Sequence, residues 1–294
     1  MPRQKYSFAQ QQCIRSAGKL SQTTGMLCPG ARVGVAVSGG MDSFVLLETM
    51  RVRQGIVPFD FSLMALHINP GFDPDSHTPL ARWLEKKGVA GHIETTDHGL
   101  RAHSPENRKN SPCFFCAMLR RKRLFELCRE YQLTHLAFGH TADDLVSTFF
   151  MNLCQNSRVQ GMNMCEEFFN GSLLVIRPLM LTEKKTIAKA AKDWELPLWS
   201  NPCPSAGKTL RTSIMDDVGR MTEGHKGMHA KIRAALCRWQ WQATIPKEDG
   251  EPGLPSRDTS LNALSAAPAF KRTPSSPDTP HRRTLTLAEP EDKS

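Results

Sequence analysis

The stretch that decides the fold is residues 32–47, RVGVAVSGGMDSFVLL. Residues 33–37 are mostly apolar and β-branched, a composition typical of a short buried strand. Residues 38–40, Ser-Gly-Gly, predict a tight turn, and a run with helical spacing begins at Asp42 and Ser43. A strand, a glycine turn and a helix in this order direct free backbone N–H groups and the positive end of the helix dipole towards a phosphate. The stretch therefore predicts a nucleotide-binding loop, with an ordinary strand–turn–helix as the alternative.

The kind of loop follows from its residues. A Walker A loop requires GxxxxGK[ST] and a dinucleotide loop requires GxGxxG, and the sequence has neither. It has SGGxDS, which resembles the PP-loop of the ATP pyrophosphatases. The resemblance implies that ATP is cleaved between its α and β phosphates, so that a substrate oxygen is activated as an adenylate. The nucleotide would be bound by Ser38, Gly39, Gly40, Asp42 and Ser43, with Asp42 also acting in catalysis.

Strand-like and helix-like runs alternate along the rest of the chain. This pattern predicts an α/β fold with a parallel sheet and helices on both faces. Ligands of such sheets bind at the carboxyl ends of the strands, where Ser38, His67 and Gly139 fall. The polar stretch 97–112 is expected to be a loop at the edge of the site. The expected strands are 61–68, 92–95, 133–138 and 173–176, and the expected helices are 76–87 (capped by Ser76 or Asp75), 114–131, 141–153 and 182–194.

Composition divides the chain into three segments. Residues 1–31 have the spacing of one amphipathic helix and form a helical lead-in. Residues 32–241 hold the expected nucleotide-binding domain. Residues 242–294 are rich in Pro, Ser, Thr and charge and contain few large apolar side chains. Such a segment cannot bury enough area to offset its ordering entropy, so we expect a disordered tail.

The net charge of the chain is +9, and its distribution indicates the kind of partner. The last 53 residues carry seven Lys/Arg and eight Asp/Glu, so the first 241 carry a net +10. A basic folded part favours a polyanion such as RNA, with an ordinary solvated surface as the alternative. There is no apolar run long enough to span a membrane and no secretory signal, and nine cysteines without a disulfide pattern fit a reducing cytosol. We therefore expect a cytoplasmic protein without a membrane segment.

The second motif is residues 138–144, FGHTADD, which follows an expected strand and runs into a helix. Gly139 allows a close turn, and His140, Asp143 and Asp144 cluster on the first helical turn. Two carboxylates near a triphosphate suit Mg²⁺, which prefers oxygen ligands and bridges phosphates. The alternative is that the acids only complement the helix dipole.

The third motif is a pair of cysteines at a helix start, Cys113 and Cys116 in PCFFC. A single CxxC is compatible with a redox pair, part of a metal site or two core cysteines. The sequence has no second CxxC or HxxxH, and the best third ligand is Cys203, held between prolines in NPCPSAG. Cysteine sulfur favours zinc or iron–sulfur clusters, and three thiolates leave one coordination position open.

Five blocks now stand in a recognisable order: SGGMDSFVLL, PCFFCAMLRRKRL, FGHTADDLVSTFFMNL, VIRPLMLTEKKTI and NPCPSAG. Together they resemble the tRNA-cytidine 2-sulfurtransferases (TtcA group) over residues 30–217. The resemblance implies that ATP adenylates a cytidine in tRNA and that sulfur arrives through a 4Fe–4S cluster. It assigns the cluster to Cys113, Cys116 and Cys203, and Mg²⁺ to Asp143, with Asp143, Cys113 and Cys203 also catalytic. The nucleotide site would include Gly139 and His140. His67, at the end of its expected strand, would also lie near the nucleotide, with a core or surface histidine as the alternative.

Two positions depart from this group, which usually has lysine where Met41 stands and a second histidine where Thr141 stands. Both changes bear on the substrate more than on the fold. A basic run, Arg120, Arg121, Lys122 and Arg123, follows the cysteine pair. We expect it to contact tRNA phosphates, with a solvated helix face as the alternative.

The leading hypothesis is an ATP-dependent tRNA thiolase that forms 2-thiocytidine with ATP, Mg²⁺ and a 4Fe–4S cluster. Its sulfur would come from a cysteine desulfurase or from sulfide, and the enzyme is a possible homodimer. The alternatives are a PP-loop sulfurtransferase acting on another nucleoside or a small molecule, and a non-catalytic nucleotide- or metal-binding module.

Overall fold

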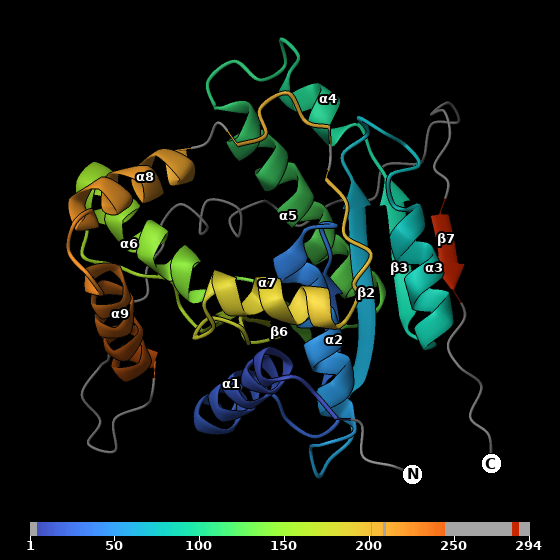
Figure 1. Ribbon diagram of the computed structural model, residues 1–294. Coiled ribbons are helices and arrows are strands. Elements are labelled where there is room, and N and C mark those ends of the chain that lie inside the picture. Colours follow the sequence, from blue (N-terminus) through green and yellow to red (C-terminus); the bar gives the residue numbers. More distant parts are fainter. Residues whose placement is uncertain (1–4, 201, 208–209, 245–283, 288–294) are drawn as a thin grey trace.

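The computed structural model describes residues 5–200, 202–207, 210–244 and 284–287 (Figure 1). Its centre is one seven-stranded sheet with the strand order β5-β6-β4-β1-β2-β3-β7. The five inner strands are parallel, which confirms the expected α/β fold. The two edge strands are antiparallel, which alternation of strands and helices could not predict. The strands are β1 (Arg32–Ala36), β2 (Ser62–Asn69), β3 (Ala90–Thr95), β4 (His135–Ala137), β5 (Cys165–Phe168), β6 (Leu173–Ile176) and β7 (Thr284–Leu287).

Helices cover both faces of the sheet, as expected (Figure 1). On one face, α1, α2, α3 and α7 pack into a single apolar cluster, and on the other face α5 packs on β2, β4 and β6. At one end of the molecule, α8 and α9 pack on α6. The helices are α1 (Phe8–Thr24), α2 (Met41–Gln54), α3 (Thr78–Lys87), α4 (His98–Ala102), α5 (Pro112–Glu130), α6 (Ala142–Asn156), α7 (Lys184–Asp193), α8 (Leu210–Thr222) and α9 (Met228–Thr244).

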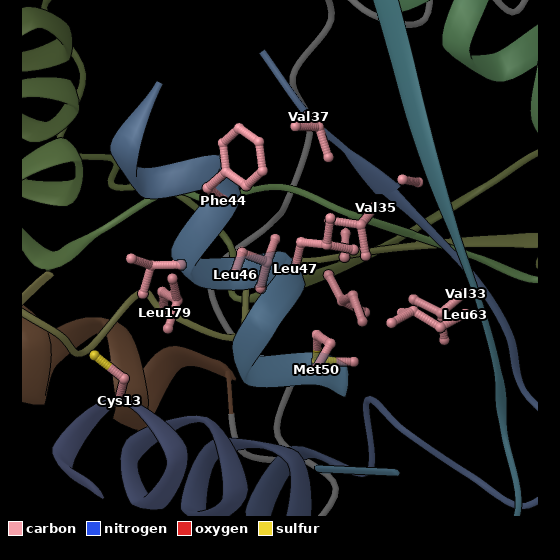
Figure 2. Close-up of a cluster of buried hydrophobic side chains, with 14 of the residues drawn as sticks. Cys13, Val33, Val35, Val37, Phe44, Leu46, Leu47, Met50, Leu63 and Leu179 are labelled. Carbon is pink, nitrogen blue, oxygen red and sulfur yellow. The ribbon is translucent and has the colours of Figure 1, made fainter. Parts of the chain in front are cut away.

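The core is built around the strand and helix of the SGGMDS stretch (Figure 2). Val33 and Val35 of β1 and Phe44 and Leu47 of α2 are fully buried in one cluster. Each such side chain stabilises the fold by about 1.5–3 kcal/mol through its removal from water. Cys13 of α1 belongs to the same cluster, so the lead-in helix packs on α2 and α7 and shares their core. This packing fixes the loop between β1 and α2 at the carboxyl edge of the sheet.

Two local expectations were wrong. The polar stretch 97–112 contains a short helix, α4, and is not only a loop. Helix α3 begins at Thr78 after His77 and has no side-chain cap. The hydroxyl group of Ser76 is instead engaged by the side-chain amide of Asn69, at 3.2 Å, so it is not the cap of the helix.

The C-terminal segment expected to be disordered is described only in part. Residues 242–244 complete α9, and Thr284–Leu287 form β7, which pairs with β3. The rest of that segment lies outside the described residues. Among the helices that the structure describes, none is long and apolar enough to cross a membrane.

Candidate functional site

The SGGMDS turn is held by its two serines. The backbone N–H of Ser38 donates to Oγ of Ser43 at 3.1 Å, and that hydroxyl donates to the carbonyl oxygen of Gly40 at 2.8 Å. Gly39 has a φ of +90°, and a Cβ atom there would lie 2.3 Å from the ring of Trp199. A side chain is therefore excluded at Gly39 by conformation and by contact. The turn leads directly into the N-terminus of α2, the arrangement that binds phosphate.

The FGHTADD motif packs directly on this turn. A Cβ atom at Gly139 would lie 2.7 Å from the carbonyl oxygen of Asp42 and 3.0 Å from the backbone nitrogen of Ser43. The close approach follows from the pairing of β1 with β4, whose carboxyl ends meet at one edge of the sheet. Glycine at this position thus brings the two nucleotide motifs, more than 90 residues apart in sequence, into one site.

Three carboxylates gather where the two motifs meet. Burial raises the pKa of Asp42 to about 6, Lys184 opposes this rise, and the charges of Asp144 and Asp143 add to it. Oδ1 of Asp42 is buried and has no hydrogen-bond partner among the described residues. Oδ2 of Asp143 accepts a hydrogen bond from the backbone N–H of Lys184 at 2.8 Å. A buried carboxylate oxygen without a donor beside a second carboxylate fits a cation such as Mg²⁺.

Asp144 has a different task. Its Oδ2 accepts hydrogen bonds from the backbone N–H and the hydroxyl group of Thr141, both at 2.9 Å, and forms a capping box for α6. Its Oδ1 lies 3.2 Å from the guanidinium of Arg211. Burial alone would raise the pKa of Asp144, but Lys184, His140, the Thr141 amide and Arg211 together lower it. Thr141 therefore has a clear local function as the N-cap of α6.

The SGGMDS turn has methionine at position 41, where a lysine was expected from the resemblance, and Lys184 lies nearby. Met41 is half-buried and packs against the apolar core, so its side chain takes no part in binding phosphate. Lys184, at the start of α7, reaches within 4.0 Å of Asp144 and acts electrostatically on Asp42. A lysine from another element thus supplies positive charge beside the turn that lacks its own.

The two histidines at this edge are neutral. Nδ1 of His67 lies 2.8 Å from the carbonyl oxygen of Val37, which assigns the proton to Nδ1. Burial lowers the pKa of His67 to about 4. Burial, with the nearby charge of Arg177, also lowers the pKa of His140. His67 packs against the ring of Trp199, with ring centroids 5.5 Å apart, and so stands beneath the SGGMDS turn.

The three candidate cysteines come together from two segments. Ser111 caps α5 and Pro112 occupies its first turn, which places Cys113 and Cys116 at the helix start. Sγ of Cys113 lies 3.8 Å from the carbonyl oxygen of Ser205, so the loop that carries Cys203 docks on this end of α5. Burial raises the pKa of Cys113 and of Cys116, and the neighbouring Cys203 raises both further.

The arrangement of these thiols bears on the group they would hold. Within the described ranges, no three His, Cys, Asp or Glu side chains close around a single metal position. Cysteine sulfur favours zinc or iron–sulfur clusters, so Cys113, Cys116 and Cys203 are candidate ligands of either. The six other cysteines lie elsewhere; Cys13 and Cys128 are buried in the core.

A cavity of about 890 Å³ lies between α5 and α6, beside the FGHTADD motif and next to the cysteine pair of α5. His140 lines it from the nucleotide side, and Ala117, the residue after Cys116, lines it from the cysteine side. Its charge is strongly positive. The arginines that line the cavity are Arg120, Arg121, Arg158, Arg177 and Arg211.

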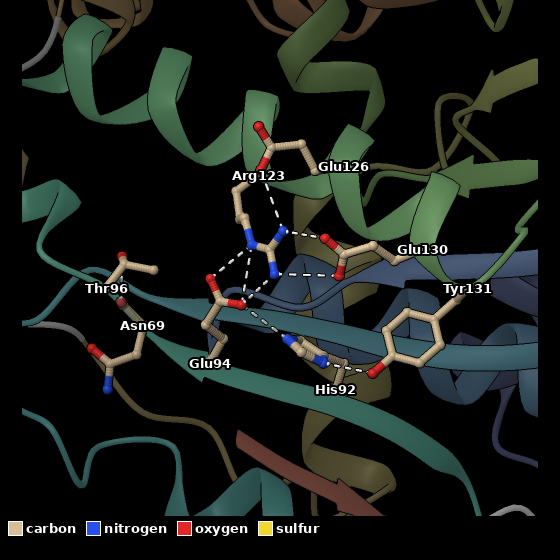
Figure 3. Close-up of polar contacts among 8 residues, drawn as sticks. All are labelled: Asn69, His92, Glu94, Thr96, Arg123, Glu126, Glu130 and Tyr131. Atoms are coloured by element: carbon tan, nitrogen blue, oxygen red, sulfur yellow. Dashed lines mark hydrogen bonds and ion pairs between the residues drawn. The ribbon is translucent and has the colours of Figure 1, made fainter. Parts of the chain in front are cut away.

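The four basic residues 120–123 of α5 have different surroundings. Arg120 and Arg121 line the cavity, and Lys122 is exposed. Arg123 faces β3, and its guanidinium lies 2.7 Å from Glu94 of that strand and 2.8 Å from Glu130 of α5 itself (Figure 3). The charge of Arg123 is already bound by carboxylates and its side chain is only 12% exposed, so Arg120 and Arg121 are better placed for the predicted RNA contact.

Sequence reasoning missed several residues of this site. Lys184 and Arg211 lie in segments without a nucleotide motif, and only the surplus of acids in FGHTADD pointed to a need for nearby cations. Trp199 and Glu166 carry no motif, and nothing in their sequence neighbourhood predicts that they lie beside the turn and the cavity.

Comparisons with known proteins agree with this geometry. A PP-loop domain model matches residues 10–214. The tRNA-cytidine(32) 2-sulfurtransferase of Idiomarina loihiensis is 35% identical over 210 residues, which are 69% of this chain and 68% of the relative. That of Geobacter sulfurreducens is 32% identical over 192 residues, 65% of this chain and 75% of the relative.

A solved structure extends the comparison to the fold. The U34-tRNA thiolase NcsA from Methanococcus maripaludis, solved with its 4Fe–4S cluster, aligns with a TM-score of 0.64 at 20% identity. The alignment covers 90% of this chain and 91% of the thiolase, which shows a shared fold. The match over the nucleotide motifs and the identity to curated relatives decide the family: the chain belongs to the PP-loop proteins and, within them, to the group of the tRNA-cytidine(32) 2-sulfurtransferases.

Proposed function

We propose that the protein catalyses the ATP-dependent 2-thiolation of a cytidine in tRNA. One observation carries the proposal: the cavity has a wall from the nucleotide motif, His140, and a wall from the cysteine-bearing helix, Ala117 and Arg120. A nucleotide in this cavity would have ATP on one side and the three thiols on the other. The relatives that act on cytidine 32 of tRNA supply the substrate.

The chemistry takes place at C2 of the base. The O2 atom of cytidine attacks the α phosphorus of ATP, an O–P bond forms, and pyrophosphate leaves. A sulfur nucleophile then attacks C2, the C–O bond breaks, and AMP leaves with the former O2. Both steps develop negative charge on phosphate oxygens, which the amides at the start of α2 and Lys184 are placed to stabilise.

The residues of the site divide between two groups that would be bound. Asp42 and Asp143 offer carboxylate oxygens to Mg²⁺, which neutralises the phosphates of the attacked nucleotide. Cys113, Cys116 and Cys203 would hold a 4Fe–4S cluster, which would supply sulfur to the reaction. Arg120 and Arg121 lie between them and would bind phosphates of the RNA.

The test uses the full chain purified without oxygen. Reconstituted protein is incubated with ATP, Mg²⁺, sulfide and a tRNA transcript that has cytidine at position 32. Pyrophosphate release and 2-thiocytidine, measured by nucleoside mass spectrometry, are the expected products, and both should disappear in Asp143→Asn. A protein that binds iron but forms thiouridine or no thionucleoside would exclude cytidine as the substrate. A protein that neither binds iron nor releases pyrophosphate would exclude the enzyme altogether.

A further inference from the structure

The cavity contains a feature that a phosphate-binding site alone does not need. Of the described residues that line it, Glu166 alone is acidic, among five arginines. Glu166 lies on the edge strand β5, and its carboxylate is 3.6 Å from the guanidinium of Arg177. The Glu166 side chain is 22% exposed, so besides its pairing with Arg177 it can accept a hydrogen bond from a ligand group that donates one.

The surroundings of Glu166 orient it towards a base. Arg177 donates to the carbonyl oxygen of Asn163 at 2.5 Å and faces Glu166 with its other terminal nitrogen. Phe168, two residues along the same strand, also lines the cavity, whereas Glu167 between them is exposed. The alternation of β5 therefore places a carboxylate and an aromatic ring together on the cavity side.

Other polar groups of the cavity also lack partners. Nδ1 of His140, Oγ1 of Thr148 and Nε of Arg177 are buried and have no hydrogen-bond partner among the described residues. Buried polar atoms are normally satisfied, so three of them around one cavity indicate a polar ligand there. They would contact a nucleobase or ribose, while Arg120 and Arg121 are placed for the phosphates.

We propose that Glu166 is the residue that selects cytosine over uracil, by accepting a hydrogen bond from the exocyclic amine at C4. Cytosine presents a donor there and uracil presents a carbonyl oxygen, which a carboxylate repels. In the ring, C4 is separated from the reacting C2–O2 group only by N3, so the amine and O2 lie on the same edge of the base. That edge would face the protein, with O2 nearer the wall of His140 and Ala117 and the amine nearer β5. This inference rests on the proposed function, since it concerns the base that is thiolated.

The test compares two neighbouring glutamates of β5. Full-length wild type, Glu166→Gln and Glu167→Gln are each reconstituted and given two tRNA transcripts that differ only in cytidine or uridine at position 32. Initial rates of pyrophosphate release and the yields of 2-thiocytidine and 2-thiouridine give a cytidine-to-uridine ratio. A glutamine amide can both accept and donate, so we expect Glu166→Gln to lower this ratio roughly tenfold. Glu167→Gln should keep the wild-type ratio because its side chain is exposed.

The outcomes of this experiment test the role of Glu166 separately from the proposed function. An unchanged ratio in an active Glu166→Gln protein would overturn the role of Glu166 and leave the proposed function standing. Wild type without pyrophosphate release on the cytidine transcript would overturn the proposed function, and this inference with it. Thermal unfolding and iron content identify a variant that has merely lost its fold; Glu166→Asp, which keeps the charge, should then preserve the preference for cytidine, and its loss would also overturn the inference.

Discussion

The two halves of helix α5 use similar residues for different purposes. In the N-terminal half, Arg120 and Arg121 line the cavity and Cys116 lies near the other two candidate thiols. In the C-terminal half, Cys128 is buried in the core and Arg123 is bound by three carboxylates (Figure 3). The difference teaches that a cysteine or an arginine gains its function from the groups opposite it. In the N-terminal half, Arg120 and Arg121 line a cavity of about 890 Å³, where a ligand can contact them.

The largest expected effect is the difference between replacing Cys116 and replacing Cys128. Cys116→Ala should abolish iron retention and thiolation, because the cluster would lose one of three ligands. Cys128→Ala should keep both and cost about 1 kcal/mol of stability, since it removes only core packing. Burial alone raises the pKa of Cys128 to about 12, so its thiol is not available for chemistry at neutral pH. Iron per chain and thiocytidine yield are the measurements, and equal iron in both variants would contradict the assignment.

The sequence predicted more of this helix than of its surroundings. Spacing predicted α5 at 114–131 against the observed Pro112–Glu130, and the CxxC at its start predicted a place for chemistry. It could not separate Arg123 from Arg121, because the partner Glu94 comes from β3, 29 residues away in the chain. Orientation depends on tertiary pairing, which four consecutive basic residues do not encode.

The same limit applies to the site as a whole. SGGMDS and FGHTADD predicted two halves of one site because both follow parallel strands, whose carboxyl ends share an edge. The cavity was not predictable, since β5 is an antiparallel edge strand that is connected to β6 by a turn of left-handed residues, Phe169, Asn170 and Gly171. Glu166 enters the cavity only through that hairpin.

The second effect is the loss of stability when Arg123 is replaced. Arg123→Met should lower the free energy of unfolding by about 3–5 kcal/mol, because it leaves the buried Glu94 with His92 as its main partner. Lys122→Met, at the exposed neighbour, should change it by less than about 0.5 kcal/mol. Urea denaturation of both variants measures the difference. A cost near that of Lys122→Met would show that the network contributes little.

The third effect is a dependence of stability on pH. Burial alone would raise the pKa of Glu94, but hydrogen bonds and charge from His92 and Arg123 overcome it and lower the pKa to about 2. Because this value lies below the ordinary 4.5, the contribution is complete above pH 4.5 and is lost as pH falls towards 2. It amounts to about 3 kcal/mol. Arg123→Met should show a shallower loss of stability across this range than wild type, and parallel curves would contradict the cause.

The smallest effect concerns RNA binding by the cavity-lining Arg120 and Arg121. Arg120→Gln and Arg121→Gln should each weaken tRNA binding several-fold, and the slope of log affinity against log salt should fall by about 0.7–0.9 for each RNA phosphate that the protein no longer neutralises. Arg123→Met, in protein that remains folded, should leave the slope unchanged, because its guanidinium already neutralises carboxylates of the protein. Counterions are released from RNA only by cations that are free to replace them. Filter binding at several salt concentrations measures the slopes, and an equal decrease in all three variants would show that the cavity arginines and Arg123 do not differ towards RNA.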